Sequence, residues 1–344
     1  MKMLTLKSAV AAAVVTGLVA PLAALADTQF LGAGATFPYP FFSRAFYAYS
    51  QDHSGVTVNY ASIGSGGGIS QFTAKTVDFG ASDVPMTKSE LQAAEDANGR
   101  VVQLPDTLGG IAISYNVASI PKHIKLSPAV LADIFLGKIT NWNDPAIAAL
   151  NPGVTFPNLA ILVAHRADGS GTTYHFTDYL CKVSPEWKTK VGNGKTVNWP
   201  AGVGAKGNEG VAGQLSNSPG AIGYIELAYA LQNDIAYAAM QNKAGEFVLP
   251  SVDSVRAAAS MKPSVSPTDF SITNMDGKDS YPISAYSWLM VWKNQADPAR
   301  GKQLADLLKW LVTGGQQYAA KVNYVPLPDN VQQEALKAIA SIHS

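Results

Sequence analysis

Residues 160–180 read AILVAHRADGSGTTYHFTDYL, and they pass from one type of local structure to another. The apolar run 160–164 predicts a strand, and residues 173–180 predict a helix. Residues 167–173 between them (ADGSGTT) form a turn rich in glycine and small hydroxyl side chains. A strand, a turn and a helix in this order form the repeating unit of α/β proteins.

Further units of this kind occur on both sides of this stretch. The pattern predicts strands at 56–60, 77–81 and 111–117, and helices near 69–76 and at 128–136. Ser127 and Pro128 are typical of a helix start, and Gly137 is suited to a left-handed helix end. The alternation predicts βαβ units and largely parallel sheets.

Other apolar patterns indicate core packing. Phe42, Phe46 and Tyr49 share one helical face, so we interpret them as core and not as a stacking platform. A later core helix is predicted to end by Gly314-Gly315, and it carries Leu304, Leu307, Leu308 and Leu311. A mobile or tightly turned loop is expected where glycines recur at positions 202, 204, 207, 210 and 213.

The first 26 residues have the pattern of a cleaved secretory signal. Lys2 and Lys7 supply positive charge, residues 8–22 are apolar or small, and Ala24-Leu25-Ala26 fits the cleavage rule. The apolar stretch is short for a membrane anchor, and Pro21 interrupts its end. We therefore expect an exported chain that begins at Asp27 and has no lipid anchor, because no cysteine follows the cleavage point.

Composition limits the classes of function. Cleavage removes 26 of the 344 residues, and 318 residues favour two lobes over one core. It also removes two of the 25 basic residues, so the remaining 23 face 25 acidic ones and the net charge is about −2. This balance argues against nucleic acid and anionic membranes as partners. Cys181 is the only cysteine, which excludes an intrachain disulfide and a thiolate metal cluster.

Three segments place glycines and small hydroxyl residues just before an expected helix: 32–38 (GAGATFP), 64–68 (GSGGG) and 167–173. The unpaired N–H groups and the dipole of a helix start attract a tetrahedral anion, and glycine lets the backbone approach it. One such turn is most often ordinary turn geometry. Three of them in one chain point to a single anion cage.

Charged residues accompany these turns. A fourth segment, 77–83 (VDFGASD), places Asp83 at the carboxyl end of a strand, where ligands bind in open α/β sheets. Arg166 follows another strand, and Asp168 is suitably spaced to orient its guanidinium toward an oxyanion. The alternative for Arg166 and Asp168 is an exposed ion pair of little consequence.

These segments closely resemble the periplasmic phosphate-binding proteins of high-affinity phosphate ABC transporters. The resemblance rests on GAGATFP at 32–38, IGSGGG at 63–68, VDFGASD at 77–83 and RADGSGT at 166–172. FLGKITNW at 135–142 and GAIGYIE at 220–226 extend it over nearly the whole mature chain. One departure is Gly66, where some relatives carry serine, and this puts a contact of the outer shell in doubt.

The resemblance implies a protein of the α/β class with a two-lobe periplasmic-binding-protein fold (type II-like), hinged by two chain crossings at 110–117 and 283–289. Lobe 1 would comprise residues 27–112 and 283–344, and lobe 2 residues 113–282. It further implies a periplasmic monomer without cofactor or catalytic activity, which binds inorganic phosphate and delivers it to the membrane permease subunits of the transporter. The implied phosphate contacts are Thr36, the Phe37 N–H, Ser65, Asp83, Arg166, Ser170, the Gly171 N–H and Thr172, with Asp168 supporting Arg166.

Three alternatives stay open. A secreted phosphatase is disfavoured because neither Ser65 nor Ser170 lies in a G-x-S-x-G elbow, and the histidines at 53, 123, 165, 175 and 343 lack metal-type spacing. A nucleotide-binding module is disfavoured because Ile69 follows the glycines where a P-loop has lysine. A binding protein for sulfate or another tetrahedral oxyanion is separated from the phosphate reading by Asp83 alone.

Overall fold

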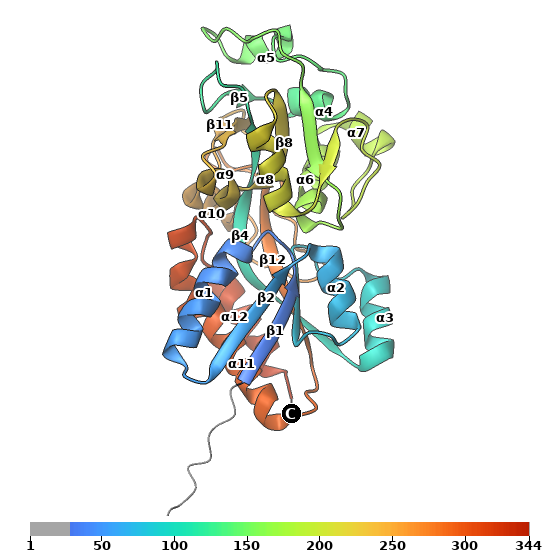
Figure 1. Cartoon of the computed structure of the whole chain (residues 1–344), viewed down its shortest axis with the longest axis vertical. Helices are drawn as coiled ribbons and strands as arrows, with labels where there is room; N and C mark the ends of the chain where they lie inside the picture. The colour runs from blue at the N-terminus through green and yellow to red at the C-terminus, as the bar shows by residue number, and fades with distance from the viewer. Residues whose placement is uncertain (1–27, 344) are drawn as a thin grey trace, which may run out of the picture.

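The computed structural model describes residues 28–343 and shows two lobes, each built on its own sheet (Figure 1). The predicted signal, residues 1–26, lies outside the described residues, so that prediction stays untested. Within residues 28–343, none of the helices has the length and apolar character needed to cross a membrane.

Sheet A forms the core of lobe 1, with strand order β2-β1-β3-β12-β4. Strands β1, β2 and β3 are parallel, whereas β12 runs antiparallel to both of its neighbours. Helices α2 and α3 lie on one side of this sheet, and α1, α11 and α12 lie on the other (Figure 1). The strands are β1 (Thr28–Gly34), β2 (Val56–Ser62), β3 (Phe79–Ser82), β4 (Val101–Tyr115) and β12 (Ser284–Trp292), and the helices are α1 (Tyr39–Asp52), α2 (Ser65–Thr73), α3 (Lys88–Asn98), α11 (Pro298–Val312) and α12 (Asp329–Ala340), with 3-10 turns η1 (Gly314–Tyr318) and η2 (Ala320–Val322).

Sheet B forms the core of lobe 2, with strand order β4-β8-β6-β7 and with β9 paired to β4. A small sheet of order β11-β10-β5 lies apart from it. The strands are β5 (Lys125–Leu126), β6 (Leu162–Arg166), β7 (Val203–Ala205), β8 (Ala221–Glu226), β9 (Ala236–Tyr237), β10 (Ala239–Gln241) and β11 (Phe247–Val248). The helices are α4 (Pro128–Phe135), α5 (Pro145–Leu150), α6 (Gly171–Val183), α7 (Pro185–Lys190), α8 (Gly207–Asn217), α9 (Leu227–Gln232) and α10 (Val252–Ser260).

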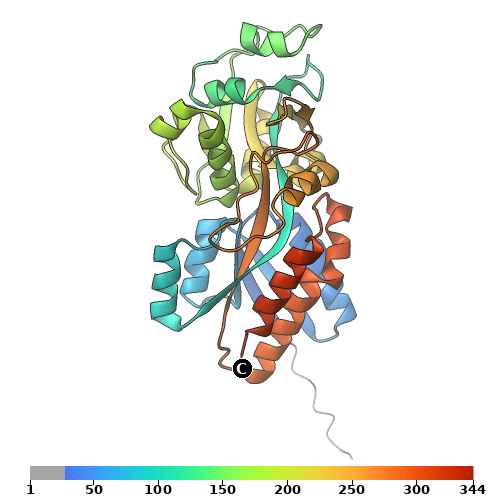
Figure 2. The ribbon, with the colours of Figure 1, turned by 180° about the vertical axis from the view of Figure 1, so that it is seen from behind.

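Strand β4 belongs to both sheets. Residues 101–110 pair with β12 in sheet A, and residues 111–115 pair with β8 in sheet B. Seen from behind, β4 and the chain that enters β12 run side by side between the lobes (Figure 2). Both predicted crossings therefore overlap these two strands, and their action as hinges stays a prediction.

The start of β4 is a correction to the predicted strand 111–117, because the strand begins ten residues earlier, at Val101. Pro105 and Asp106 interrupt the apolar pattern there, so the first part of the strand was not predicted. Proline is tolerated inside a strand at a bulge. The pairing of β4 with β12 does shift between Ser287 and Trp288.

Several local predictions are confirmed. The Ser127 hydroxyl accepts from the Val130 N–H at the start of α4, and Gly137 has φ 73° just after this helix ends. The predicted core residues of α1 and the leucines of α11 are buried. Apolar packing thus fixes the helices against the sheets, and glycine supplies the left-handed conformation that stops α4.

Other boundaries differ. The glycine-rich region predicted as a loop contains β7 and α8, and only Gly202 (φ 106°) and Gly207 (φ 72°) have positive φ among its glycines. Helix α2 begins at Ser65 and helix α6 at Gly171, each earlier than the apolar pattern indicated. Strand β6 includes Arg166, and strand β3 ends at Ser82, next to Asp83. Small polar residues form these ends, so apolar periodicity does not detect them.

Candidate functional site

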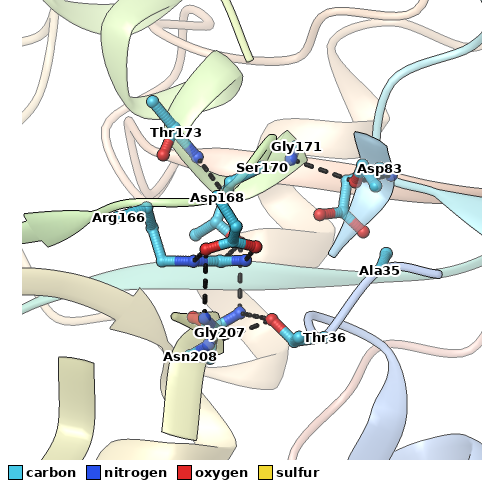
Figure 3. A network of polar contacts seen from close by, with 12 residues as sticks. Ala35, Thr36, Asp83, Arg166, Asp168, Ser170, Gly171, Thr173, Gly207 and Asn208 are labelled. Carbon is cyan, nitrogen blue, oxygen red and sulfur yellow. Dashed lines mark hydrogen bonds and ion pairs between the residues drawn. The ribbon is translucent and has the colours of Figure 1, made fainter. Parts of the chain in front are cut away.

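The predicted site residues come together between the two lobes. Thr36 and Phe37 precede α1, Ser65 begins α2, and Asp83 follows β3 in lobe 1. From lobe 2, Arg166 ends β6, and Ser170, Gly171 and Thr172 form the start of α6. All of these residues are buried. Figure 3 shows Thr36 and Asp83 facing Arg166, Ser170 and Gly171 from the other wall.

Arg166 is held in one orientation by Asp168. Its Nε donates to Asp168 Oδ1 at 2.7 Å and its Nη2 donates to Oδ2 at 2.5 Å. Burial opposes ionisation of Asp168, but the hydrogen bonds and charge of Arg166 outweigh it and keep the pKa of this carboxyl below its ordinary value. The Arg166 side chain is 1% exposed, so the alternative of an exposed, inconsequential ion pair is wrong.

Each hydroxyl that faces the site accepts hydrogen bonds from within the protein. Ser65 Oγ accepts from the N–H of Asp83 at 3.2 Å and from the N–H of Gly171 at 3.0 Å. Ser170 Oγ accepts from the Thr173 N–H at 3.0 Å and caps α6. A hydroxyl whose lone pairs meet donors keeps its own proton available, so it acts as a donor toward a ligand.

Asn208 extends this arrangement and was not predicted from the sequence. Its backbone N–H and its Nδ2 donate to Thr36 Oγ1 at 3.0 and 2.8 Å. The same Nδ2 donates to Thr172 Oγ1 at 3.1 Å, and Arg166 Nη1 reaches that oxygen at 3.4 Å. The Glu226 N–H donates to Asn208 Oδ1, which fixes the orientation of the amide. Asn208 therefore orients the hydroxyl protons of Thr36 and Thr172 away from itself.

The sequence does carry a signal for Asn208. It is the second residue of α8, after Gly207, and is thus a further glycine and small polar pair at a helix start. The repeated glycines around it were interpreted as a loop, so the helix was not predicted. In Figure 3, Asn208 and Gly207 lie beside Thr36 and Asp168, and the Gly207 N–H donates to Asp168 Oδ1 at 3.1 Å.

Asp83 is the one carboxyl among the predicted contacts. Burial raises its pKa to about 7, although the charge of Arg166 acts in the opposite direction. Its Oδ1 is buried and has no hydrogen-bond partner among residues 28–343. The site therefore joins several donors to one strong acceptor that can hold a proton near neutral pH.

Backbone groups complete the site. The Gly171 N–H donates to Ser65 Oγ, so the predicted contact between this N–H and an anion requires that bond to be exchanged or shared. The Phe37 carbonyl accepts from Tyr324 Oη at 2.5 Å. The Phe37 N–H forms no backbone or side-chain bond within the described chain, which leaves it available to a ligand.

The two lobes contact each other around the site. The Gly66 N–H donates to the Gly169 carbonyl at 2.9 Å, and a Cβ at position 66 would lie 3.2 Å from Gly169 Cα. His175 Nε2 lies 2.8 Å from the Asp83 carbonyl oxygen. Lys195 Nζ, near α6, donates to Glu90 Oε1 of α3 at 2.5 Å. The structure thus represents a closed arrangement of the lobes.

A small cavity lies at the edge of this site. It has a volume of about 290 Å³, and its lining includes Thr36, Asp168, Lys206 and Glu209. Within the described chain, no group of three or more histidine, cysteine, aspartate or glutamate side chains is arranged to hold a metal ion. The site chemistry is that of hydrogen-bond donors, a guanidinium and a carboxyl.

Comparison with known proteins gives consistent matches. A profile of the PBP superfamily domain matches residues 20–314. The phosphate-binding protein PstS of Xylella fastidiosa is 47% identical over 309 residues, which cover 88% of this chain and 82% of that protein. The phosphate-binding protein PstS of Pasteurella multocida is 49% identical over 306 residues, which cover 88% of this chain and 87% of that protein.

Solved structures show the same fold. A high-affinity periplasmic phosphate-binding protein bound with phosphate has a TM-score of 0.69 at 22% identity, and the match covers 89% of this chain and 92% of that one. An ancestral soluble variant of the human phosphate binding protein has a TM-score of 0.73 at 22% identity, with coverage of 89% and 93%. At this identity the likeness supports the two-lobe fold alone.

Proposed function

Because this chain belongs to the PBP superfamily and to its family of phosphate-binding proteins, we propose that it captures inorganic phosphate between its lobes and delivers it to a membrane ABC transporter for import. The observation that carries this proposal is the cage itself, in which oriented donors and a buried guanidinium face a single carboxyl. This arrangement suits a tetrahedral oxyanion that still carries a proton.

The proposed contacts are the predicted ones, and Asn208 joins them as a positioning residue. Thr36, Ser65, Ser170 and Thr172 would donate through their hydroxyls, and the N–H groups of Phe37 and Gly171 would add backbone donors. Arg166, held by Asp168, would bind two anion oxygens, since a guanidinium presents paired donors. Asp83 would accept the proton of the phosphate.

Binding without chemistry is the second part of the proposal. The relatives are named as binding proteins. A serine nucleophile is activated by an adjacent general base, most often histidine, but the side-chain bonds of Ser65 and Ser170 within the described residues are to backbone N–H groups. We propose that the protein acts as a periplasmic monomer that requires no cofactor and has the permease subunits of the transporter as its partners.

The proposed lobe limits are residues 27–112 with 283–344, and residues 113–282. Their support is the change of partner along β4, since Gly110 pairs with Ser284 of β12 and Ile111 pairs with Glu226 of β8. Ligand would favour the closed state, because only closure brings both sets of donors to the same anion.

Isothermal titration of the mature protein, stripped of ligand, tests the proposal. Phosphate should bind tightly with one site per chain, and sulfate should bind far more weakly. Equal binding of both anions would favour a general oxyanion-binding protein. Turnover of a chromogenic phosphoester by the same sample would favour the phosphatase alternative.

A further inference from the structure

A second buried carboxyl, Asp106, lies behind the proposed phosphate site. Ser82, the last residue of β3, pairs with Trp288 of β12, and Trp288 pairs with Pro105 of β4. The next pair on β12 and β4 is Ser287 with Thr107, so Asp106 is the extra residue of a bulge. Bulges redirect a side chain, and they are frequent next to functional sites.

This register places three polar residues in one row across neighbouring strands. Asp83 follows Ser82, Ser287 precedes Trp288, and Asp106 follows Pro105. Each of the three is at most 1% exposed. Ser287 lies between the two aspartates because its strand, β12, is the strand between β3 and β4, and its hydroxyl favours the charged form of both carboxyls.

Several polar atoms of the row form no hydrogen bond in the structure, either with one another or with the rest of residues 28–343. They are Asp83 Oδ1, both side-chain oxygens of Asp106 and Ser287 Oγ. An ionised carboxylate with no partner costs several kcal/mol to bury, whereas a neutral acid costs far less and can donate. One proton on Asp106, together with a small reorientation of the Ser287 side chain, would let all three residues form a hydrogen bond.

The charges around Asp106 support a neutral acid. Burial raises its pKa well above the ordinary value, and the negative charge of Asp83 raises it further, while Ser287 only partly opposes them. The phenol of Tyr60 on β2 also responds to these charges, since its own pKa is raised by burial and by both aspartates. None of the helices that pack on β4 presents a cation that lowers the pKa of Asp106; they are α3, α9, α10, α11 and α12.

We propose that Asp106 is a positioning residue of the anion site: as a neutral acid it donates to Ser287, and Ser287 donates to Asp83 Oδ1. Asp83 then stays ionised with its second oxygen free to accept from the ligand. This inference rests on the proposed binding of phosphate and deepens it. A carboxylic acid kept neutral by its surroundings so that it can donate is a known device of protein sites.

We call the proposed chain of hydrogen bonds from Asp106 through Ser287 to Asp83 the relay. Four variants distinguish an effect of the relay on phosphate binding from a general effect on packing. Asp106→Asn keeps a donor, Asp106→Val removes it, and Ser287→Ala removes the hydroxyl between the two carboxyls. The control Ser114→Ala removes a buried hydroxyl at a different position, on β4, that also has no partner in the described chain. Circular dichroism and thermal melts first confirm that each variant is folded. Phosphate titrations of each are then run from pH 5.5 to 9.

We expect Asp106→Asn and Ser114→Ala to bind phosphate within about threefold of wild type at pH 7.5. Asp106→Val and Ser287→Ala should bind about tenfold or more weakly, because Asp83 loses a hydrogen bond to its charged form. The double variant Asp106→Val/Ser287→Ala should bind phosphate no more weakly than either single variant, since both changes break the same chain of bonds.

The pH dependence of phosphate affinity is the decisive measurement, because a change in packing alone would not shift it. Without the relay, the pKa of Asp83 rises, so the loss of phosphate affinity toward acid should begin at higher pH in Asp106→Val and Ser287→Ala only. Profiles of these two variants that match Ser114→Ala would overturn the inference. A tenfold gain in Asp106→Asn would also overturn it, because that result shows a charged Asp106. If wild type binds no phosphate, the proposed function fails instead.

Discussion

Arg166 has a guanidinium whose geometry cannot be reproduced by lysine. Asp168 holds it at two points, which leaves its remaining N–H groups directed at Thr172 and the site. Replacing it by lysine puts a point charge in place of a planar fork. Because hydrogen bonds to charged groups contribute roughly 1.5–3 kcal/mol each, we expect Arg166→Lys to weaken phosphate binding by about ten- to a few hundred-fold.

Titration calorimetry measures this effect, with Arg300→Lys as a matched control. Arg300 also forms a two-point pair, with Asp78, but its side chain is 38% exposed and lies on α11. The control should bind phosphate like wild type. Wild-type affinity in Arg166→Lys would remove Arg166 from the site.

Asp83 should decide between phosphate and sulfate. Phosphate keeps at least one proton near neutral pH and can donate it to Asp83, whereas sulfate would bring an unprotonated oxygen against a carboxylate. Sites that require such a hydrogen bond reject an analogue that lacks it by roughly 10⁴–10⁵-fold. We expect Asp83→Asn, which supplies an amide donor, to gain affinity for sulfate and retain much of its affinity for phosphate.

The measurement is the ratio of the two affinities in wild type, Asp83→Asn and the control Asp78→Asn. Asp78 lies just before β3 and pairs with Arg300, away from the cage. Only Asp83→Asn should lower the ratio of phosphate to sulfate affinity. An unchanged ratio would assign the discrimination to another residue.

At the scale of elements, helix α8 is where the sequence was least informative. The glycine-rich turns before α1, α2 and α6 were predicted because each contains a hydroxyl residue and is followed by a segment with an apolar helical pattern. Helix α8 has four of its eleven positions filled by glycine or alanine next to small polar residues, so its apolar pattern is weak. Its contribution to the site depends on tertiary contacts of Asn208 with Thr36 and Thr172.

Among the strands, too, some were predicted from the sequence and others were not. Strand β2 has an uninterrupted alternating pattern and was predicted, and so was the C-terminal part of β4, whereas β1 (Thr28–Gly34) was not predicted as a strand. The first part of β4 was not, because the bulge at Asp106 breaks the alternation and is specified only by pairing with β12. The motif residues of the cage were assigned by resemblance, whereas Asn208 and Asp106 required the three-dimensional structure.

The start of α8 provides a test of donor orientation. Asn208→Ala should weaken phosphate binding by about tenfold, because Thr36 and Thr172 lose the donors that direct their protons toward the ligand. Asn208→Asp should weaken it further, since a carboxylate would accept those protons and add a negative charge. Asn217, at the other end of α8, is exposed and supplies the control variants Asn217→Ala and Asn217→Asp. If Asn208→Asp binds phosphate as well as Asn208→Ala does, Asn208 does not act by orienting hydroxyls.

On the scale of the whole molecule, buried carboxyls make stability depend on pH. Burial raises the pKa of Asp83, Asp106 and Glu226 in the folded protein, from ordinary values of 3.8 for aspartate and 4.5 for glutamate. At these three carboxyls the folded state therefore holds more protons than the unfolded state between pH 4 and at least pH 7, whereas burial lowers the pKa of His165 and His175, which act in the opposite direction below about pH 6.5. Stability that is present below the unfolded pKa is lost as pH rises through this window.

We expect the free energy of unfolding without phosphate to fall between pH 6.5 and pH 8, above the range in which the two histidines titrate, by up to about 1.4 kcal/mol per pH unit for each carboxyl that takes up a proton on folding. Urea unfolding at the two pH values measures it. Glu226→Gln should flatten the dependence, because a neutral amide no longer titrates. The exposed Glu334→Gln is the control, and a stability that rises from pH 6.5 to pH 8 would contradict the assignment.

Closure of the lobes is the motion that the proposed function requires. The donors come from both walls, and backbone groups of Gly66 and Gly169 meet directly across the gap. We expect X-ray scattering to show a smaller radius of gyration when phosphate is added. Gly66→Val should oppose this change, because even a Cβ at this position lies 3.2 Å from Gly169 Cα and two further methyl groups need more room. Gly213→Val places the same side chain on α8, where a Cβ meets no atom within 4 Å.

The two glycine variants make the closure prediction specific. With saturating phosphate, Gly66→Val should keep a radius of gyration close to that of the ligand-free protein and bind phosphate more weakly, since the second wall cannot complete its contacts. Gly213→Val should close and bind like wild type, which controls for the effect of valine on a helix. If wild type binds phosphate with no change in radius, the lobes do not move on binding. In that case the contact between Gly66 and Gly169 is a permanent part of the fold, and phosphate must enter a site that is already closed.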